Sequence, residues 1–404
     1  MAFTRVALLC VLLGSAAGSA FAADKSYDPG ATDKTIKIGN TAPYSGPGSA
    51  YSTIAKTEAA YFKFINDQGG VNGRQIEFIS YDDAFSPPKA VEQTRKLIES
   101  DEVLFTISAL GNPGLSVQKY MSTKGVPQLF LATGAAKANV PDTFKWTIGW
   151  TPSYALESAI YVKHILATAP DAKIGVLYQN DDFGRAFLDH MKADLGPKAS
   201  MIVSEMPYTP TDPTVDPLVA NIKAAGADTF ISLTTPKAAG QALKKVTELG
   251  WKPRYYQGSV AASIGSVIRP VGLEYATGMI TAGVYKDFSD PKLRDDEGMK
   301  KFVAFMDKYL PDGDKADGNY VVGYLVAQAT VDVVKRAGDK LTRENILEQA
   351  RSIKDLSLDM MLPGLALNTS HKNHFPFGKM RLLRFTGVTW EPISGPVDGT
   401  TAIE

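Results

Sequence analysis

Side chains able to catalyse a reaction or bind a metal are few in this sequence and poorly grouped. The 4 histidines are His164, His190, His371 and His374, and Cys10 is the single cysteine. A zinc site needs three or four ligands, and Cys10 lies in an apolar N-terminal segment that we expect to be removed. No GxSxG or HExxH motif occurs. The sequence therefore indicates no metal site, no cofactor and no catalytic residue.

Two pairs of adjacent acids, Asp82–Asp83 and Asp181–Asp182, are the other candidates for chemistry. Paired carboxylates can serve as general acid and base. Side chains adjacent in sequence point apart more often than together, so we interpret both pairs as helix caps or turn residues. A hydrolase stays open as an alternative function, although no nucleophile–base arrangement supports it.

What remains is ligand binding by small and hydroxyl-bearing residues at the ends of predicted strands. Three such segments are residues 44–52, 110–114 and 132–134. In an open α/β sheet, ligands bind at the carboxyl ends of the strands, and helix N-termini there favour an anion. An ordinary loop whose tyrosines pack on the following helix would show the same pattern in the first segment. No nucleotide-binding glycine motif is present.

Residues 36–83 show how such a binding edge is positioned. Ile36 and Ile38 alternate with polar neighbours, which is typical of a strand. Apolar residues then recur at spacings of three and four as far as Ile65, which predicts a helix. Residues 75–80 alternate again. The segment is therefore predicted to be one β-α-β unit with parallel strands and a right-handed crossover.

The alternation of strands and helices continues to residue 134 and restarts after residues 146–152. It predicts a second sheet of the same type, with Phe183, Thr235 and Ser259 at its binding edge. The fold class is therefore α/β, with two doubly wound parallel-sheet lobes. The length of 404 residues agrees, because single cores seldom grow beyond about 300 residues.

Residues 1–22 have the three parts of a secretory signal. Arg5 is their only charged residue, residues 6–13 are apolar, and residues 20–22 read Ala-Phe-Ala, a small-x-small cleavage site. We expect cleavage near Ala22 and a soluble periplasmic protein. The chain has 43 basic and 43 acidic residues, without a charge block, so no nucleic-acid partner is predicted.

The first β-α-β unit also carries a family resemblance. Ser45-Gly46-Pro47, then Tyr51, then NDQGGVNGR at residues 66–74 and Tyr-Asp-Asp at residues 81–83 resemble the N-terminal signature of periplasmic leucine/isoleucine/valine-binding proteins. These are the solute receptors of branched-chain amino-acid-type ABC importers. The resemblance implies a small carboxylate ligand, an inner-membrane permease with cytoplasmic ATPases as partner, and a monomer.

It also implies two lobes joined by three crossings of the chain. Lobe 1 would comprise residues 31–148 with 284–362, and lobe 2 residues 149–283 with 363–404. A ligand sensor or amide-binding regulator of the same fold is the alternative, and the secretion signal favours the transport receptor.

The resemblance also implies a set of ligand-binding residues. It places the carboxylate against backbone and hydroxyl groups of lobe 1, under an aromatic cover, with further contacts from lobe 2 and one aromatic residue near the hinge. These positions are Tyr51, Gly111, Asn112, Ala132, Thr133, Gly134, Phe183, Thr235, Ser259 and Tyr320.

Two positions depart from the family pattern. Gly111 stands where the family has a serine for the carboxylate, and Ser259 stands where it has an acid for the ligand's ammonium. An ammonium buried without a counter-charge costs several kcal/mol. We therefore expect a carboxylate without an α-ammonium, such as an aromatic or hydroxylated acid, over leucine or valine. A small shift in register would instead bring Asp181 or Asp182 to the ammonium.

Overall fold

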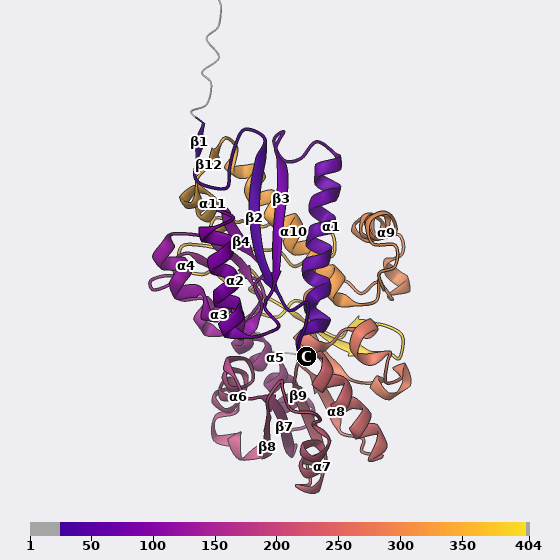
Figure 1. The fold of residues 1–404 in the computed structure, drawn as a ribbon. Coiled ribbons are helices and arrows are strands. Elements are labelled where there is room, and N and C mark those ends of the chain that lie inside the picture. The colour runs from indigo at the N-terminus through magenta and orange to yellow at the C-terminus, as the bar shows by residue number, and fades with distance from the viewer. Residues whose placement is uncertain (1–24, 401–404) are drawn as a thin grey trace, which may run out of the picture.

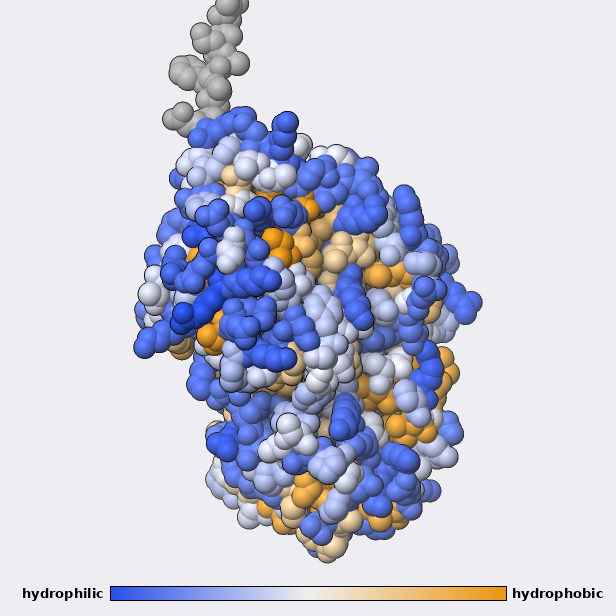
Figure 2. All heavy atoms as spheres, viewed as in Figure 1, coloured by the Kyte–Doolittle hydropathy of each residue, from blue (hydrophilic) through white to orange (hydrophobic). Residues whose placement is uncertain are grey.

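The computed structural model describes residues 25–400 and forms two α/β halves, one above the other in Figure 1. The predicted signal segment lies outside the described residues. No helix among those residues is long and apolar enough to cross a membrane. Figure 2 shows a mostly hydrophilic face on which apolar residues form small separate patches.

The first half contains a five-stranded sheet in which every paired strand is parallel. Its spatial order is β3-β2-β4-β5-β6. The strands are β2 (Thr35–Ala42), β3 (Gln75–Asp82), β4 (Phe105–Ile107), β5 (Gln128–Leu131) and β6 (Thr147–Gly149).

Helices from both ends of the chain cover this sheet. They are α1 (Ser52–Asp67), α2 (Pro87–Glu99), α3 (Gly111–Ser116), α4 (Gln118–Lys124), α9 (Glu297–Tyr309), α10 (Gly318–Ala337) and α11 (Arg343–Ala350). Helix α1 lies along α10, and a Cβ at Gly323 would be 2.4 Å from the carbonyl oxygen of Ile54. Only glycine permits this close approach. Residues 110–114, predicted as a loop, instead form the first turn of α3.

The second half contains a seven-stranded sheet of order β14-β13-β11-β10-β9-β7-β8. Its strands are β7 (Ile174–Gln179), β8 (Ile202–Tyr208), β9 (Thr229–Leu233), β10 (Arg254–Gln257), β11 (Ile280–Gly283), β13 (Arg381–Phe385) and β14 (Trp390–Pro392). Helix α5 (Tyr154–Thr168) leads from β6 of the first sheet into β7, and helices α6 (Asp182–Leu195), α7 (Asp216–Ala224) and α8 (Pro236–Glu248) connect the parallel strands β7, β8, β9 and β10. The predicted parallel second sheet is confirmed for β7 to β11, and the antiparallel strands β13 and β14 extend it at the β11 edge.

Residues 363–377, which we expected in the second lobe, contact the first half. His374 accepts a hydrogen bond from the N–H of Gly149 at 3.0 Å and bonds the carbonyl of Thr147 at 2.7 Å. Thr369 bonds Ala350 and Ile353. The segment is thus held by the first half, and the chain joins the second sheet only at β13.

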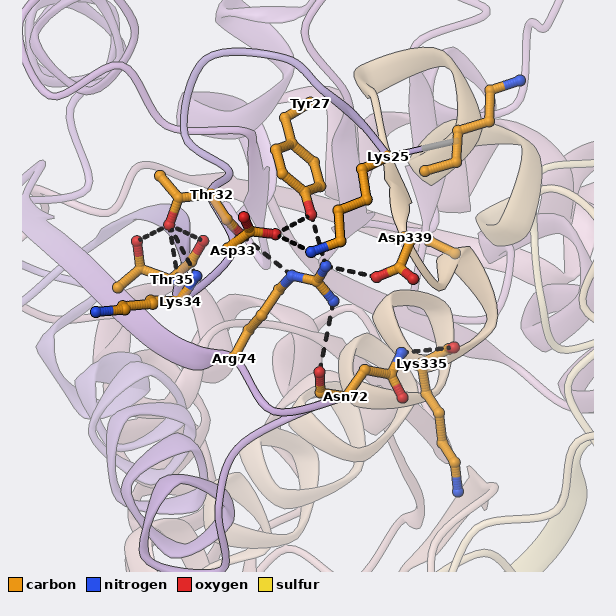
Figure 3. Close-up of polar contacts among 12 residues, drawn as sticks. Lys25, Tyr27, Thr32, Asp33, Lys34, Thr35, Asn72, Arg74, Lys335 and Asp339 are labelled. Atoms are coloured by element: carbon orange, nitrogen blue, oxygen red, sulfur yellow. Dashed lines mark hydrogen bonds and ion pairs between the residues drawn. The ribbon is translucent and has the colours of Figure 1, made fainter. Parts of the chain in front are cut away.

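A buried arginine joins the start of the described chain to the first half (Figure 3). Arg74 bonds Asp339 at 2.6 Å, the hydroxyl of Tyr27 at 2.7 Å and the carbonyl of Thr32 at 3.1 Å. The same region pairs β1 (Ser26–Tyr27) with β12 (Lys340–Leu341). The arginine of the NDQGGVNGR motif therefore has a structural role at the end of the sheet opposite to the binding edge.

Glu58 on α1 is a buried acid with one unsatisfied oxygen. Ser108 donates a hydrogen bond to Oε2 at 2.9 Å, whereas Oε1 has no partner. Burial raises the pKa of Glu58 to about 8 from its ordinary 4.5. The pKa of Glu58 is thus higher in the folded protein than in the unfolded chain. At pH values between about 4.5 and 8, the carboxyl group is protonated in the folded protein and ionised in the unfolded chain. The contribution of Glu58 to stability is complete below about pH 4.5 and is lost as the pH rises towards 8.

We therefore predict that Glu58→Gln changes the pH dependence of stability. Relative to wild type, the variant should gain roughly 3 kcal/mol in free energy of unfolding between mildly acidic and mildly alkaline pH, since it carries no acid to ionise. Urea unfolding across this range measures the difference. The exposed Glu77→Gln variant is the matched control and should follow wild type; parallel curves for all three proteins would contradict the prediction.

Candidate functional site

A cavity of about 210 Å³ lies between the two halves, where the carboxyl ends of the parallel strands of both sheets face each other. Leu110 and Ala132 follow β4 and β5 of the first sheet. Asp181, Thr235 and Ser259 follow β7, β9 and β10 of the second. Both binding edges predicted from sequence therefore contribute to one site, as expected for open α/β sheets.

Of the ten predicted site residues, eight lie on the wall of this cavity: Tyr51, Gly111, Asn112, Ala132, Thr133, Phe183, Thr235 and Ser259. The structure does not bring Gly134 and Tyr320 to the wall. A Cβ at Gly134 would lie 2.3 Å from the carbonyl oxygen of Pro152 and 2.7 Å from the ring of Tyr154, which stands between Gly134 and the cavity. The Tyr320 ring packs against Gly313, and its neighbour Asn319 reaches the wall instead.

Aromatic rings form much of the apolar wall. The rings of Tyr154 and Phe183 lie 4.9 Å apart in a tilted arrangement. Phe85 also lines the cavity and was missed by sequence reasoning. Its φ of 57° and that of Ala84 at 49° are unusual for residues with side chains. This turn directs the Phe85 ring into the cavity. The turn has no periodic pattern in the sequence from which it could be predicted.

Tyr51 connects the two halves across the cavity. Its hydroxyl donates to the carbonyl oxygen of Val260 at 3.1 Å, and the side chain is buried. Burial raises the pKa of Tyr51 well above its ordinary value, so the hydroxyl remains a donor. The residue predicted to cover the ligand therefore also joins the first half to the second.

The first half offers few free donors to a ligand. The N–H groups of Gly111, Ala132 and Thr133 already donate to backbone carbonyls. The N–H of Asn112 lies in the first turn of α3 and has no acceptor among the described residues. The Thr133 hydroxyl accepts from Ala135 N at 3.2 Å and is 3.3 Å from the hydroxyl of Tyr154. Asn112 and Thr133 are thus the donors left for a carboxylate.

The second half contributes Asp181, which caps helix α6. One of its oxygens accepts from the N–H groups of Phe183 and Gly184, and the other accepts from the Gln179 side chain at 2.7 Å. Burial raises the pKa of Asp181, and these hydrogen bonds oppose the rise. The interpretation of Asp181 as a helix cap is confirmed, while Thr235 is held by Tyr208 and Gln179.

An acid that sequence reasoning missed lies behind Ser259. Glu157, in the first turn of α5, is buried and accepts from the Ser259 N–H at 2.7 Å and from the Ser259 hydroxyl at 2.7 Å. Tyr161 donates to the same carboxylate at 2.7 Å. Burial raises the pKa of Glu157 against these three hydrogen bonds. Glu157 itself is not on the cavity wall.

Lys286 is the lysine on the wall, and its charge is already paired. Its ammonium contacts Asp296 at 2.6 Å and the carbonyl of Asp359 at 2.8 Å. Within residues 25–400, no cluster of three or more His, Asp or Glu side chains is arranged to hold a metal. A ligand in this cavity would meet aromatic rings, hydroxyl and amide groups, and the carboxylates of Asp181, Asp182 and Asp287, of which Asp182 pairs with Lys137.

Comparison with known proteins identifies the chain's relatives. A family model described as periplasmic binding protein matches residues 35–388. The chain is 24% identical over 323 residues to the Leu/Ile/Val-binding protein homolog 1 of Brucella abortus (strain 2308), covering 76% of this chain and 80% of the relative.

Solved structures show the same fold at lower identity. A branched chain amino acid ABC transporter protein from Thermus thermophilus with bound valine has a TM-score of 0.81 and 17% identity, covering 90% of this chain and 96% of that one. A solute binding protein of an ABC transporter from Rhodopseudomonas palustris BisB5, in complex with 3,4-dihydroxy benzoic acid, has a TM-score of 0.73 and 18% identity, covering 92% and 98%.

We predict that Tyr51→Phe shifts the two halves apart. The substitution keeps the ring but removes the hydrogen bond to Val260, worth about 1 kcal/mol and hence several-fold in an open–closed equilibrium. Protein expressed from residue 23 lacks Cys10, so exposed Lys89 and Lys237, one on each half, can be replaced by cysteine and spin-labelled. Double electron–electron resonance should then show longer distances in the variant.

The label pair without the Tyr51 change is the reference. A second control is Tyr120→Phe, whose hydroxyl bonds Glu99 within the first half. Identical distance distributions for all three proteins would show that the Tyr51 hydroxyl does not hold the halves together.

Proposed function

The chain belongs to the periplasmic binding protein family, and from this membership we propose that it is the substrate-binding component of an ABC importer. In this proposal it binds a small carboxylate in the periplasm and delivers it to an inner-membrane permease with cytoplasmic ATPases. The protein acts as a monomer and performs no chemistry on its ligand. The predicted secretion signal and the named relatives support this role.

We propose that the binding unit consists of two lobes that close on the ligand. Lobe 1 comprises residues 31–148 with 284–377, and lobe 2 comprises residues 149–283 with 378–404; the last boundary is moved to account for the contacts of residues 363–377. The cavity between the sheets supports the arrangement, because residues of both halves surround one small volume. Closure about such connections is a common response of two-lobed proteins to a ligand.

The proposed class of ligand rests on one observation: the charged groups at the cavity wall already have partners within the protein. Asp181 already accepts three hydrogen bonds, Glu157 lies behind Ser259, and Lys286 is paired with Asp296. The other two acids on the wall also have partners: Asp182 pairs with Lys137, and Asp287 accepts hydrogen bonds from Ser289, Thr389 and Trp390. A ligand ammonium would therefore lose its hydration without gaining an unsatisfied acid, at a cost of several kcal/mol. A carboxylate can still use Asn112 and Thr133.

We therefore propose an aromatic or hydroxylated carboxylic acid as the ligand, in preference to leucine, isoleucine or valine. The rings of Tyr51, Phe85, Tyr154 and Phe183 support this, since aromatic side chains favour offset or edge-to-face contact with a ring. Structural neighbours bind either class, since one holds valine and another holds 3,4-dihydroxy benzoic acid. The wall residues of this chain support the aromatic acid.

Calorimetry and thermal unfolding test this proposal with 4-hydroxybenzoate, benzoate, leucine and valine. A ligand at 100 times its Kd should stabilise the folded protein by about 2.7 kcal/mol and raise Tm by several degrees. We expect the aromatic acids to do so and the amino acids not to. Tyr51→Ala, which removes a ring from the wall, should weaken every ligand, whereas Tyr120→Phe should not. Tight binding of leucine or valine without a response to aromatic acids would contradict the proposal.

A further inference from the structure

Ser259 is the wall residue whose hydrogen-bonding direction is fixed by the protein. Its hydroxyl is half-buried at the cavity and donates its only proton to Glu157 Oε2. Its N–H donates to Oε1 of the same carboxylate. No other hydrogen bond to the Ser259 hydroxyl exists among the described residues. The oxygen of this wall residue therefore has lone pairs left to accept a hydrogen bond from a ligand.

Glu157 is itself fixed in place by its surroundings. The Tyr161 hydroxyl accepts the N–H of Ala282 at 3.0 Å, and its single proton has two acceptors within reach, Glu157 Oε1 at 2.7 Å and the carbonyl oxygen of Gln257 at 2.8 Å. A backbone N–H can only donate, so Oε1 must act as an acceptor towards Ser259 N. Oε2 is thus left for the hydroxyl of Ser259. Only 1% of Glu157 is exposed, so a ligand meets the serine and not the acid.

We propose that Glu157 is a positioning residue that turns Ser259 into an acceptor and so selects ligands with a hydrogen-bond donor at the end facing the second half. The ligand class is a ring with a carboxylate at one end and a hydroxyl or amino group at the other. This inference rests on the proposed function, which places the carboxylate at Asn112 and Thr133. A ligand with only an acceptor at that end faces the Ser259 lone pairs, and such a mismatch costs affinity.

The test uses probes that differ only at the end meeting Ser259. 4-Aminobenzoate offers a donor, 4-formylbenzoate offers only an acceptor, and benzoate offers neither. Calorimetry is done at mildly alkaline pH, because burial raises the pKa of Glu157 and a higher pH favours the ionised carboxylate that accepts from Ser259. For wild type we expect 4-aminobenzoate to bind about tenfold more tightly than benzoate, and 4-formylbenzoate no more tightly than benzoate. Equal affinities for the three acids would overturn the inference while leaving the proposed function standing.

The decisive variant is Glu157→Gln, which keeps the shape of the side chain. The amide oxygen can still accept from Ser259 N and Tyr161, so the amide nitrogen replaces Oε2 and donates to the Ser259 hydroxyl. The serine proton then turns into the cavity. We expect the preference to invert, with 4-formylbenzoate bound more tightly than 4-aminobenzoate. A uniform loss of affinity for all probes would show a merely structural role and overturn the inference.

Two further variants complete the design. Ser259→Ala removes the oxygen and should bring the affinity ratio of the two substituted probes close to one, even if Glu157→Gln fails to fold. Glu58→Gln neutralises the other fully buried glutamate, which is not on the cavity wall, and should leave the ratio as in wild type. A donor preference that survives Ser259→Ala would overturn the inference.

Uncharged probes separate this inference from the proposed function. 4-Aminobenzamide and 4-formylbenzamide present the same donor and acceptor without a carboxylate. If the amides show the donor preference and the acids do not bind, the reading of Ser259 holds and the carboxylate proposal is wrong. If neither series binds, both proposals are wrong.

Discussion

The structure depends on one constraint: two sheets direct the carboxyl ends of their parallel strands at the same small cavity, so polar groups at those ends are buried together. Buried charges are tolerated only when paired or hydrogen-bonded. Asp181 caps a helix, Glu157 accepts from Ser259 and Tyr161, and Lys286 pairs with Asp296. These three charges, and those of the wall acids Asp182 and Asp287, have partners within the protein, so a ligand finds donors, acceptors and rings there rather than an unpaired charge.

The position of Glu157 changes what an acid in this region does. An acid on the wall could pair directly with an ammonium, whereas one behind a serine acts through the direction of a hydroxyl. Direct pairing gains Coulomb energy but must offset the desolvation of both charges. A hydroxyl held as an acceptor discriminates by the presence of a ligand donor, and a mismatch leaves a buried polar group unpaired. The chain thus retains a carboxylate here but uses it for orientation.

Sequence periodicity was enough to predict the first β-α-β unit. Apolar residues alternate with polar ones along β2 and β3, and they recur every three or four positions along α1. It could not show that β13 runs antiparallel, since strand direction depends on where the chain re-enters the sheet. Nor could it find Glu157, whose partner Ser259 is 102 positions away. Tyr320 illustrates another limit: neighbouring helix residues point about 100° apart, so the cavity receives Asn319 and not the ring.

The links between the halves limit how much of the binding energy can come from closure itself. Tyr51 bonds Val260, Ser263 bonds Asp317 at 2.8 Å, and Arg269 pairs with Asp314 at a largely exposed site. Exposed ion pairs contribute about 0–1 kcal/mol, and a neutral hydrogen bond about 1 kcal/mol. These contacts form whatever the ligand is, so they cannot distinguish one ligand from another. Under the proposed function, discrimination must come from groups at both ends of the ligand, which are Asn112 and Ser259, because a ligand shifts a conformational equilibrium only through contacts that differ between the two states.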